Sequence, residues 1–369
     1  MQKGIKIRIY PNKKQIETLV NTFGCKRFVR NHFLKYAEEN NDYSYNNWSK
    51  QLTIMKQDEK YAFLKKCDKF ALQNALKDLK AAYHNFFVDI KKDKTSRKFV
   101  NKPVFASKKS EKQSYRTNFT NNNIEINKNY IKLPKLSKVK CKYNYDLSNI
   151  KIVSVTIVKT PANEYYASLI YEKENEVVIK TNKSVGLDLG VRTLITTSDK
   201  ETYQNPIKLN KIEKKIKRLQ RKISKKKLDT NNRKKIRIKK AKIEAHKANI
   251  INDAIHKATS KIVKSYDVIY LEDIDINDLV SKQEKKYNKR KLIATSLGKV
   301  RRYLEYKSKM YDKQIHYIDR YYPSSQICSC CGNRYDVKDS KIYQCPHCKL
   351  EIDRDYNAAI NILRYGLTH

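Results

Sequence analysis

The chain has 369 residues, a length that predicts two or three domains. It carries 81 Lys and Arg against 38 Asp and Glu, so its formal net charge is +43, which predicts a nucleic-acid partner. An anionic membrane surface is a weaker candidate, because the charge is spread along the whole chain. A stretch of 18 apolar residues is missing, and Met1–Lys6 lacks the apolar run of a secretory signal, so we expect a cytoplasmic protein that does not span a membrane.

The first half of the chain predicts a β-structure interrupted by helices. Alternating Ile5, Ile7 and Ile9 predict a strand over residues 3–10, and Asn12 with Gln15 resembles a capping box that begins a helix. We expect two successive helices there and a third with an apolar stripe from Leu72 to Phe86. Strands follow over 124–172, and we expect them to complete a β-barrel begun by residues 3–10, with a helical unit over residues 12–90 inserted into it.

Residues 91–123 are rich in lysine and contain Phe99, Phe105, Tyr115 and Phe119. Aromatic rings stack on nucleobases while lysines follow phosphates, so this segment could contact nucleic acid. A solvated loop with a few anchoring aromatics explains the pattern equally well, and both interpretations stay open.

Residues 207–262 predict two long helices joined by a turn at 229–232. Between Lys211 and Lys247, 18 of 37 residues are Lys or Arg. A solvated hairpin is the simplest interpretation. Because so much like charge is costly unless phosphate neutralises it, we also expect this hairpin to contact nucleic acid.

The segment Gly186-Leu187-Asp188-Leu189-Gly190 predicts a strand with one carboxylate between two glycines on one face. A lone buried Asp is costly unless it is paired, protonated or bound to a metal, and we expect the glycines to leave room for a metal and a phosphate. The alternative is a tight turn with a surface Asp.

Two further acidic sites follow along the chain. The apolar strand 267–271 ends in Glu272 and Asp273, and parallel α/β sheets place their sites at such carboxyl ends; alternation does not choose between the two acids. Asp353 and Asp355 open a C-terminal helix, with Asp353 a candidate N-cap. Acidic residues are favoured in the first turn of any helix, and a strand end is often simply surface, so neither site is specific by itself.

Together these carboxylates could hold two Mg²⁺ ions about 3.5–4 Å apart, an arrangement that hydrolyses phosphodiesters. A chain of this charge with such a site would be a nuclease.

Five of eight cysteines lie within residues 328–348. The pairs Cys328/Cys331 and Cys345/Cys348 have the spacing of a tetrahedral structural Zn²⁺ site. Cys330 could replace a member of the first pair, and His347 could replace Cys348.

These motifs, with Pro323-Ser324-Ser325-Gln326 before the cysteines and Asp353-Arg354-Asp355-Tyr356-Asn357-Ala358-Ala359 after them, resemble the TnpB (OrfB) family of bacterial insertion sequences, which is related to miniature type V CRISPR effectors. Phe23-Gly24-Cys25-Lys26-Arg27 and Leu304-Glu305-Tyr306-Lys307 extend the resemblance along nearly the whole chain.

The resemblance implies an Mg²⁺-dependent, RNA-guided DNA endonuclease. Such a protein binds a guide RNA from the transposon end, recognises a short motif beside its double-stranded DNA target, and cuts with one RuvC-like site of RNase H fold. The triad would be Asp188, Glu272 and Asp355, and Gln73 and Asn74 would contact the target-adjacent DNA.

The implied fold is an α/β RuvC-like domain (181–325 and 350–369), a zinc ribbon (326–349), a wedge-type β-barrel (1–11 and 96–180) and helical recognition domain (12–95). A nuclease-inactive RNA-guided repressor, a compact type V CRISPR effector and a structure-selective resolvase without RNA are the alternatives.

Overall fold

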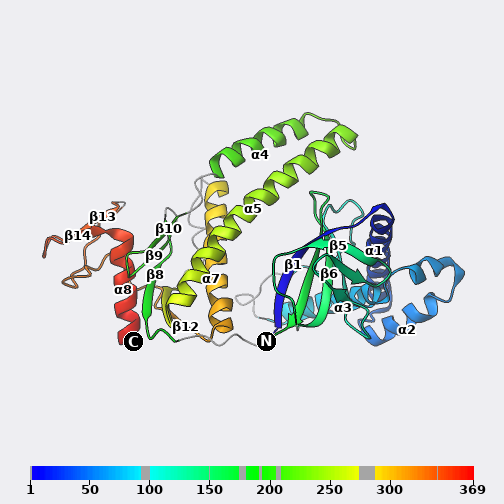
Figure 1. Cartoon of the computed structure of the whole chain (residues 1–369), viewed down its shortest axis with the longest axis horizontal. Coiled ribbons are helices and arrows are strands. Elements are labelled where there is room, and N and C mark those ends of the chain that lie inside the picture. Colours follow the sequence, from blue (N-terminus) through cyan, green and yellow to red (C-terminus); the bar gives the residue numbers. More distant parts are fainter. Residues whose placement is uncertain are drawn as a thin grey trace. The chain divides into compact units, whose positions relative to one another are not determined.

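The computed structural model describes residues 2–92, 100–148, 150–173, 180–190, 193–204, 209–273, 287–338 and 340–369 (Figure 1). The chain divides into two compact units, Met1–Glu174 and Asn175–His369. Among the helices so described, none has the length and apolarity needed to cross a lipid bilayer.

The helices of the first unit lie between its first and second strands. They are α1 (Lys13–Asn40), α2 (Tyr45–Met55), the 3₁₀ segment η1 (Glu59–Lys66) and α3 (Lys69–Ile90). The predicted capping box of Asn12 and Gln15 is confirmed. The prediction of two helices before residue 40 is wrong, because α1 continues through Gly24 and buries one stripe along its whole length, including Leu19, Val29 and Phe33.

A seven-stranded sheet forms the rest of the first unit, in the order β2-β6-β7-β1-β5-β4-β3. Strand β1 (Gln2–Tyr10) pairs antiparallel with both β7 (Tyr165–Glu172) and β5 (Ser137–Lys142), so the N-terminus joins strands far along the chain. The others are β2 (Gln113–Asn118), β3 (Glu125–Ile126), β4 (Tyr130–Leu133) and β6 (Lys151–Lys159).

The strand β2 corrects part of the expectation for residues 91–123. Tyr115 is 1% exposed in the core of the sheet and therefore cannot stack on a nucleobase, whereas Phe105 is 57% exposed. Phe99 lies outside the described residues.

The second unit is built on a five-stranded sheet in the order β10-β9-β8-β11-β12. Strands β8 (Ser184–Asp188), β9 (Thr193–Thr197) and β10 (Thr202–Gln204) form an antiparallel meander. The predicted buried strand after the long helices is confirmed as β11 (Val268–Glu272), which runs parallel to β8 and to β12 (Gln314–Ile318).

Helices cover both faces of this sheet. The apolar sides of β8 and β11 share one core with α5 (Asn231–Ser265) and α7 (Tyr287–Met310), through residues such as Leu187, Leu271 and Ile262. Helix α8 (Arg354–Thr368) packs on β8 from the opposite face. Helix α4 (Leu209–Ser224) and the first half of α5 project from the sheet as a hairpin (Figure 1).

Candidate active site and metal centre

One face of the second sheet brings two of the predicted acids together. Tyr270 of β11 lies opposite Gly186 of β8, and Leu271 lies opposite Leu187. Because side chains alternate along a strand, Asp188 and Glu272 leave the same face at the carboxyl ends of adjacent parallel strands. Both side chains are half-buried.

Gly186 has a different role from the one expected. A methyl group at this position would lie 2.2 Å from the carbonyl oxygen of Ala359 and 2.6 Å from the backbone nitrogen of Leu363. The space above Gly186 is therefore filled by the backbone of α8 and is not open to a metal or a phosphate. The glycine lets α8 approach β8 closely, and Gly366 does the same farther along, against the ring of Tyr270.

This close packing carries the third predicted acid to the site. Asp353 is the N-cap of α8, as predicted, and its carboxylate accepts a hydrogen bond of 3.0 Å from the backbone of Tyr356. Asp355 lies in the first turn, and its Oδ2 is 4.0 Å from the point where a side chain at Gly190 would begin. Helix α8 thus begins beside the carboxyl end of β8.

The charges of the neighbouring acids act on Asp188. Burial raises the pKa of Asp188 well above its usual value, and the nearby carboxylates of Glu272 and Asp355 raise it further, while Arg354 acts in the opposite direction. Burial also raises the pKa of Glu272, opposed by a hydrogen bond from Ser324. The site therefore concentrates negative charge in a partly desolvated place, where a cation would be strongly attracted.

Glu272, and not Asp273, is the β11 acid that faces Asp188. The Ser324 hydroxyl donates to Glu272 Oε1 at 2.5 Å, and the Ser324 carbonyl accepts from the Asn361 amide of α8 at 2.9 Å. Asp273 instead accepts from Arg301 of α7 at 2.7 Å. The pairing of β11 with β8 thus makes the choice that alternation within one strand left open, and Ser324 and Arg301 hold the two acids in their separate places.

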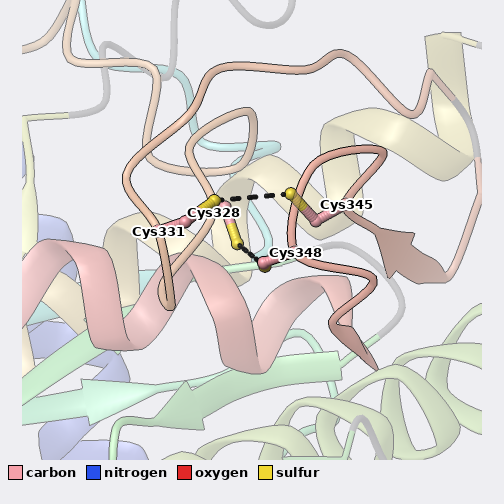
Figure 2. A group of neighbouring side chains, drawn as sticks. All are labelled: Cys328, Cys331, Cys345 and Cys348. Atoms are coloured by element: carbon pink, nitrogen blue, oxygen red, sulfur yellow. Dashed lines mark hydrogen bonds between the residues drawn. The ribbon is translucent and has the colours of Figure 1, made fainter.

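The four predicted cysteines form a second cluster (Figure 2). The Sγ atoms of Cys328, Cys331, Cys345 and Cys348 all lie within 4.8 Å of one another, with Cys328–Cys348 at 3.5 Å and Cys331–Cys345 at 3.6 Å. Sulfurs bound to one tetrahedral zinc at about 2.3 Å would be roughly 3.8 Å apart, so the cluster could hold such an ion. Neither Cys330 nor His347 belongs to it.

The cysteine-bearing segment is tied to α8 through buried amides. Asn357, which is fully buried, accepts from the backbone of Ser329 at 2.9 Å and donates to the Ile327 carbonyl at 2.7 Å. Asn361 donates to the same carbonyl at 2.6 Å, and Arg364 donates to the Ser329 carbonyl. The helix that carries Asp355 therefore also anchors the cysteine knuckle.

In the part of the chain that the structure describes, the cysteines are the one group of three or more metal-ligating atoms that are all within 4.8 Å of one another. The three acids share a neighbourhood but are more widely spaced. Carboxylate oxygens are the ligands that Mg²⁺ prefers, so these acids could hold divalent cations.

The candidate nucleic-acid contacts lie elsewhere. Asn74 is buried in α3, and its amide donates to the Arg116 carbonyl of β2 at 2.9 Å, while the neighbouring Gln73 is half-buried. On the projecting hairpin, Lys247 of α5 pairs with Glu213 of α4 at 2.7 Å. Arg233 donates to the carbonyls of Ile223 and Lys226 at the end of α4. The tip of this basic hairpin is thus held together by its own side chains.

Sequence reasoning did not identify the positioning side chains Ser324, Asn361 and Arg301. Ser324 stood within the Pro-Ser-Ser-Gln motif, which was a signal, but nothing in the sequence indicated its partner.

Three family models match the chain in order. They are described as a "Helix-turn-helix domain" of the OrfB type (residues 1–41), a "Probable transposase" of the same type (168–283) and a "Cas12f1-like, TNB domain" (298–362). The first covers a strand and the single helix α1 in this structure.

Two proteins that are similar to this chain over nearly its whole length are both named putative RNA-guided DNA endonucleases. A "Putative RNA-guided DNA endonuclease" of Streptomyces pristinaespiralis is 29% identical over 100% of this chain and 90% of its own. The "Putative RNA-guided DNA endonuclease InsQ" of Escherichia coli K12 is 27% identical over 99% and 92%. The mini RNA-guided endonuclease CRISPR-Cas phi3 has a similar fold, with a TM-score of 0.52 at 10% identity over 100% of this chain and 92% of its own.

Proposed function

Because the chain belongs to the TnpB (OrfB) family, we propose that it is an RNA-guided DNA endonuclease. It binds a guide RNA transcribed from a transposon end, recognises a short motif beside its double-stranded target, and hydrolyses DNA phosphodiesters. The observation that carries this proposal is the convergence of acids from β8, β11 and α8 at the carboxyl ends of two adjacent strands, in a strongly basic chain.

We assign the catalytic role to Asp188, Glu272 and Asp355. Their fit to divalent cations rests on the convergence of three carboxylates, which raises the pKa of Asp188, because a cation would relieve the repulsion that burial makes costly. Two Mg²⁺ ions, when bound, would activate a water and stabilise the leaving oxygen.

The remaining residues position these acids. Asp188 leaves the same face of the sheet as Glu272, and the carboxylates of Glu272 and Asp355 both raise its pKa. Ser324 fixes the orientation of Glu272 by donating to Oε1, and Asn361 holds Ser324 in turn. Gly186 sets the distance between α8 and β8 and therefore the place of Asp355. Preorganised groups of this kind need no rearrangement when the phosphate arrives.

The cysteine cluster supports a structural zinc. All four tetrahedral positions would be filled by thiolates, which leaves none for a substrate. The buried amides of Asn357 and Asn361 connect this ribbon to α8, so the zinc would stabilise the segment that carries Ser324.

In domain terms, we propose that residues 181–325 and 350–369 form the RuvC-like domain of RNase H fold and residues 326–349 the zinc ribbon. The antiparallel meander β8–β10 with parallel β11 and β12 added beside β8 supports that fold. Residues 1–11 and 96–180 would be the wedge barrel and 12–95 the recognition domain, with Gln73 the more accessible of the two candidate DNA contacts.

The α4–α5 hairpin would hold the guide–target duplex through its phosphates. Guide pairing reads the sequence, so the protein needs charge distributed along a surface more than a base-reading motif. The 18 basic residues between Lys211 and Lys247 support this role.

The experiment is to sequence the RNA that copurifies with the full chain and then test cleavage. A plasmid library that carries the matching target beside randomised sequence is incubated with the complex and Mg²⁺. We expect one defined transcript and double-strand cleavage dependent on a short motif. Asp188→Ala should abolish cutting and retain the RNA.

Each alternative predicts a different result. A defined RNA without cleavage by the wild-type protein would favour the repressor, and cleavage without defined RNA would favour a resolvase. A guide derived from a neighbouring repeat array would identify a CRISPR effector.

A further inference from the structure

Two buried cysteines of the first unit take no part in the acidic site or the cysteine cluster described above. Cys25 lies in the middle of α1 and is 6% exposed, and Cys67 directly follows η1 and is 4% exposed. Both belong to the apolar core that α1, α2, η1 and α3 share. The fold therefore brings two thiols that are distant in the sequence into one core.

Aromatic side chains pack α1 against η1 beside these thiols. The ring of Phe28, one turn after Cys25, lies 5.4 Å from the ring of Phe63 and 5.9 Å from the ring of Tyr61. At the end of η1, the Cys67 thiol donates to the carbonyl of Phe63 at 3.9 Å. The packing of the two elements thus fixes the places of both sulfur atoms.

The two thiols also contact each other through a hydrogen bond between their side chains. This bond from Cys25 lowers the pKa of Cys67, burial opposes the effect, and a hydrogen bond with Thr22 lowers the pKa further. The same bond, together with burial, raises the pKa of Cys25. Cys67 is therefore the thiol that gives up its proton more readily, and a thiolate is the reactive form of cysteine.

Cys67 also stands at the start of α3. Asp68, the next residue, is the N-cap of this helix, and its carboxylate accepts from the backbone of Phe70 at 2.9 Å. Farther along α3, the Asn74 amide donates to a backbone carbonyl of β2 at 2.9 Å. A covalent bond between Cys25 and Cys67 would fasten the beginning of this helix to the middle of α1.

We propose that Cys25 and Cys67 are a site of reversible oxidation, at which a hydroperoxide converts the two thiols into a disulfide that fastens α3 to α1. The Cys67 thiolate attacks a peroxide oxygen and the O–O bond breaks. Cys67 becomes a sulfenic acid, and the leaving oxygen takes up the proton that Cys67 released. The Cys25 sulfur then attacks the Cys67 sulfur, the S–O bond breaks, and hydroxide leaves with the Cys25 proton as water. The two thiols lose two electrons, and the peroxide gains them.

The contact between the two thiols makes this oxidation specific and reversible. Because both sulfurs are almost fully buried, a small hydroperoxide reaches them more easily than a bulky disulfide reagent does. Because the Cys25 thiol already contacts Cys67, it captures the sulfenic acid before a second peroxide oxidises it irreversibly. Disulfides that form transiently in reducing surroundings are typically redox-sensing ones. The inference does not depend on the nuclease function proposed above.

The test treats the full chain with hydrogen peroxide and maps its tryptic peptides without reduction. Trypsin cleaves after Lys26 and Lys66, so Cys25 and Cys67 fall in separate peptides unless a bond joins them. We expect these two peptides to be linked and dithiothreitol to release them. Cys141→Ala is the matched control, because Cys141 is also 4% exposed but lies in the core of the sheet. This variant should form the link as the wild type does.

Two alanine variants test the order of the steps. Cys25→Ala lacks the resolving thiol, so its Cys67 should remain a sulfenic acid that dimedone labels. Cys67→Ala lacks the thiol that attacks the peroxide, so its Cys25 should stay largely unlabelled. Peptide mapping reads these labels separately from any oxidation of the zinc-ribbon cysteines.

The stability of the first unit gives a second readout. The disulfide would close a loop of about 40 residues, which typically lowers the unfolding equilibrium constant roughly 30- to 1000-fold. Trp48, which is buried in the same core, should report this as a shift of its fluorescence transition to higher urea on oxidation. Cys141→Ala should show the same shift between its reduced and oxidised forms, and Cys25→Ala should show none.

Two results would overturn the proposal. One is a native chain that peroxide leaves without the link, whether Cys67 stays reduced or goes on to a sulfinic acid. The other is a link that forms only after urea has unfolded the chain, because the fold would then not be what joins the thiols. Asp188→Ala retains both cysteines and should form the link as the wild type does, so loss of cleavage is separable from loss of this site.

Discussion

The variant Gly186→Ala tests how α8 is placed on the sheet. Its added methyl would lie 2.2 Å from the Ala359 carbonyl oxygen and 2.9 Å from Leu363 Cβ, whereas ordinary contact begins near 3.4 Å. Because the nearest atom belongs to backbone, the helix itself must move by roughly 1 Å. Overpacking of this kind costs about 1–3 kcal/mol of unfolding free energy. A displacement of that size at a catalytic group can reduce the rate about 100-fold, so we expect cleavage to fall by that order.

Two measurements separate this effect from a general loss of folding. Hydrogen exchange of peptides from α8 should become faster in Gly186→Ala. The fluorescence transition of the single tryptophan, Trp48, should stay unchanged, because Trp48 is buried in the other unit. Gly24→Ala is the control: its methyl would have 3.9 Å to its nearest neighbour, and alanine favours a helix interior by about 0.5–1 kcal/mol. It should raise the Trp48 transition. Wild-type exchange in α8 together with wild-type cleavage in Gly186→Ala would refute the reasoning.

Three further expectations concern other side chains. Ser324→Ala should slow cleavage about tenfold, because a hydrogen bond to a carboxylate is worth about 1.5–3 kcal/mol. Ser325→Ala is the control and should cut as the wild type does. Equal cleavage rates in the two variants would contradict the positioning role of Ser324. Burial alone would raise the pKa of Asp267, but Lys313 and two backbone N–H groups lower it to about 2. The contribution of Asp267 to the free energy of unfolding is therefore present above pH 4 and is lost as the pH falls toward 2. After allowance for solvent screening, Asp267→Asn should lower the free energy of unfolding by about 1 kcal/mol relative to the wild type. Urea unfolding should show this difference becoming smaller between pH 5 and 2.5, and a difference that stays constant would contradict the role of Asp267. Elemental analysis should find about one zinc per chain in the wild type and in Cys330→Ser but little in Cys345→Ser, and a full complement in the last would exclude the four-thiolate site.

The local features of the site could be predicted from the sequence. The alternation around Asp188, the apolar run before Glu272 and the N-cap at Asp353 are short-range patterns, and the structure has the elements they predict. The cysteine pairs were equally clear, because metal geometry fixes their spacing. The strand β2 was missed because its six residues alternate only weakly between polar and apolar positions.

Long-range features could not be read in the same way. Gly186, two residues before Asp188, was interpreted as space for a ligand, but its neighbour is a helix about 170 residues away in the sequence. The choice of Glu272 over Asp273 depends on the register of β11 against β8, and the partners of the two acids, Ser324 and Arg301, follow from tertiary packing. Residues that hold a site through partners distant in the chain leave no periodic pattern by which they could be found.

The central claim is that these acids hold divalent cations against DNA, and Mn²⁺ binding monitored by electron paramagnetic resonance tests it most directly. The measurement uses the guide complex on an uncleavable target, with Glu272→Gln compared with its neighbour Asp273→Asn. We expect the first to weaken Mn²⁺ binding at least about tenfold, because it removes a ligand charge, and the second to bind as the wild type does. Wild-type Mn²⁺ affinity in Glu272→Gln would contradict the claim.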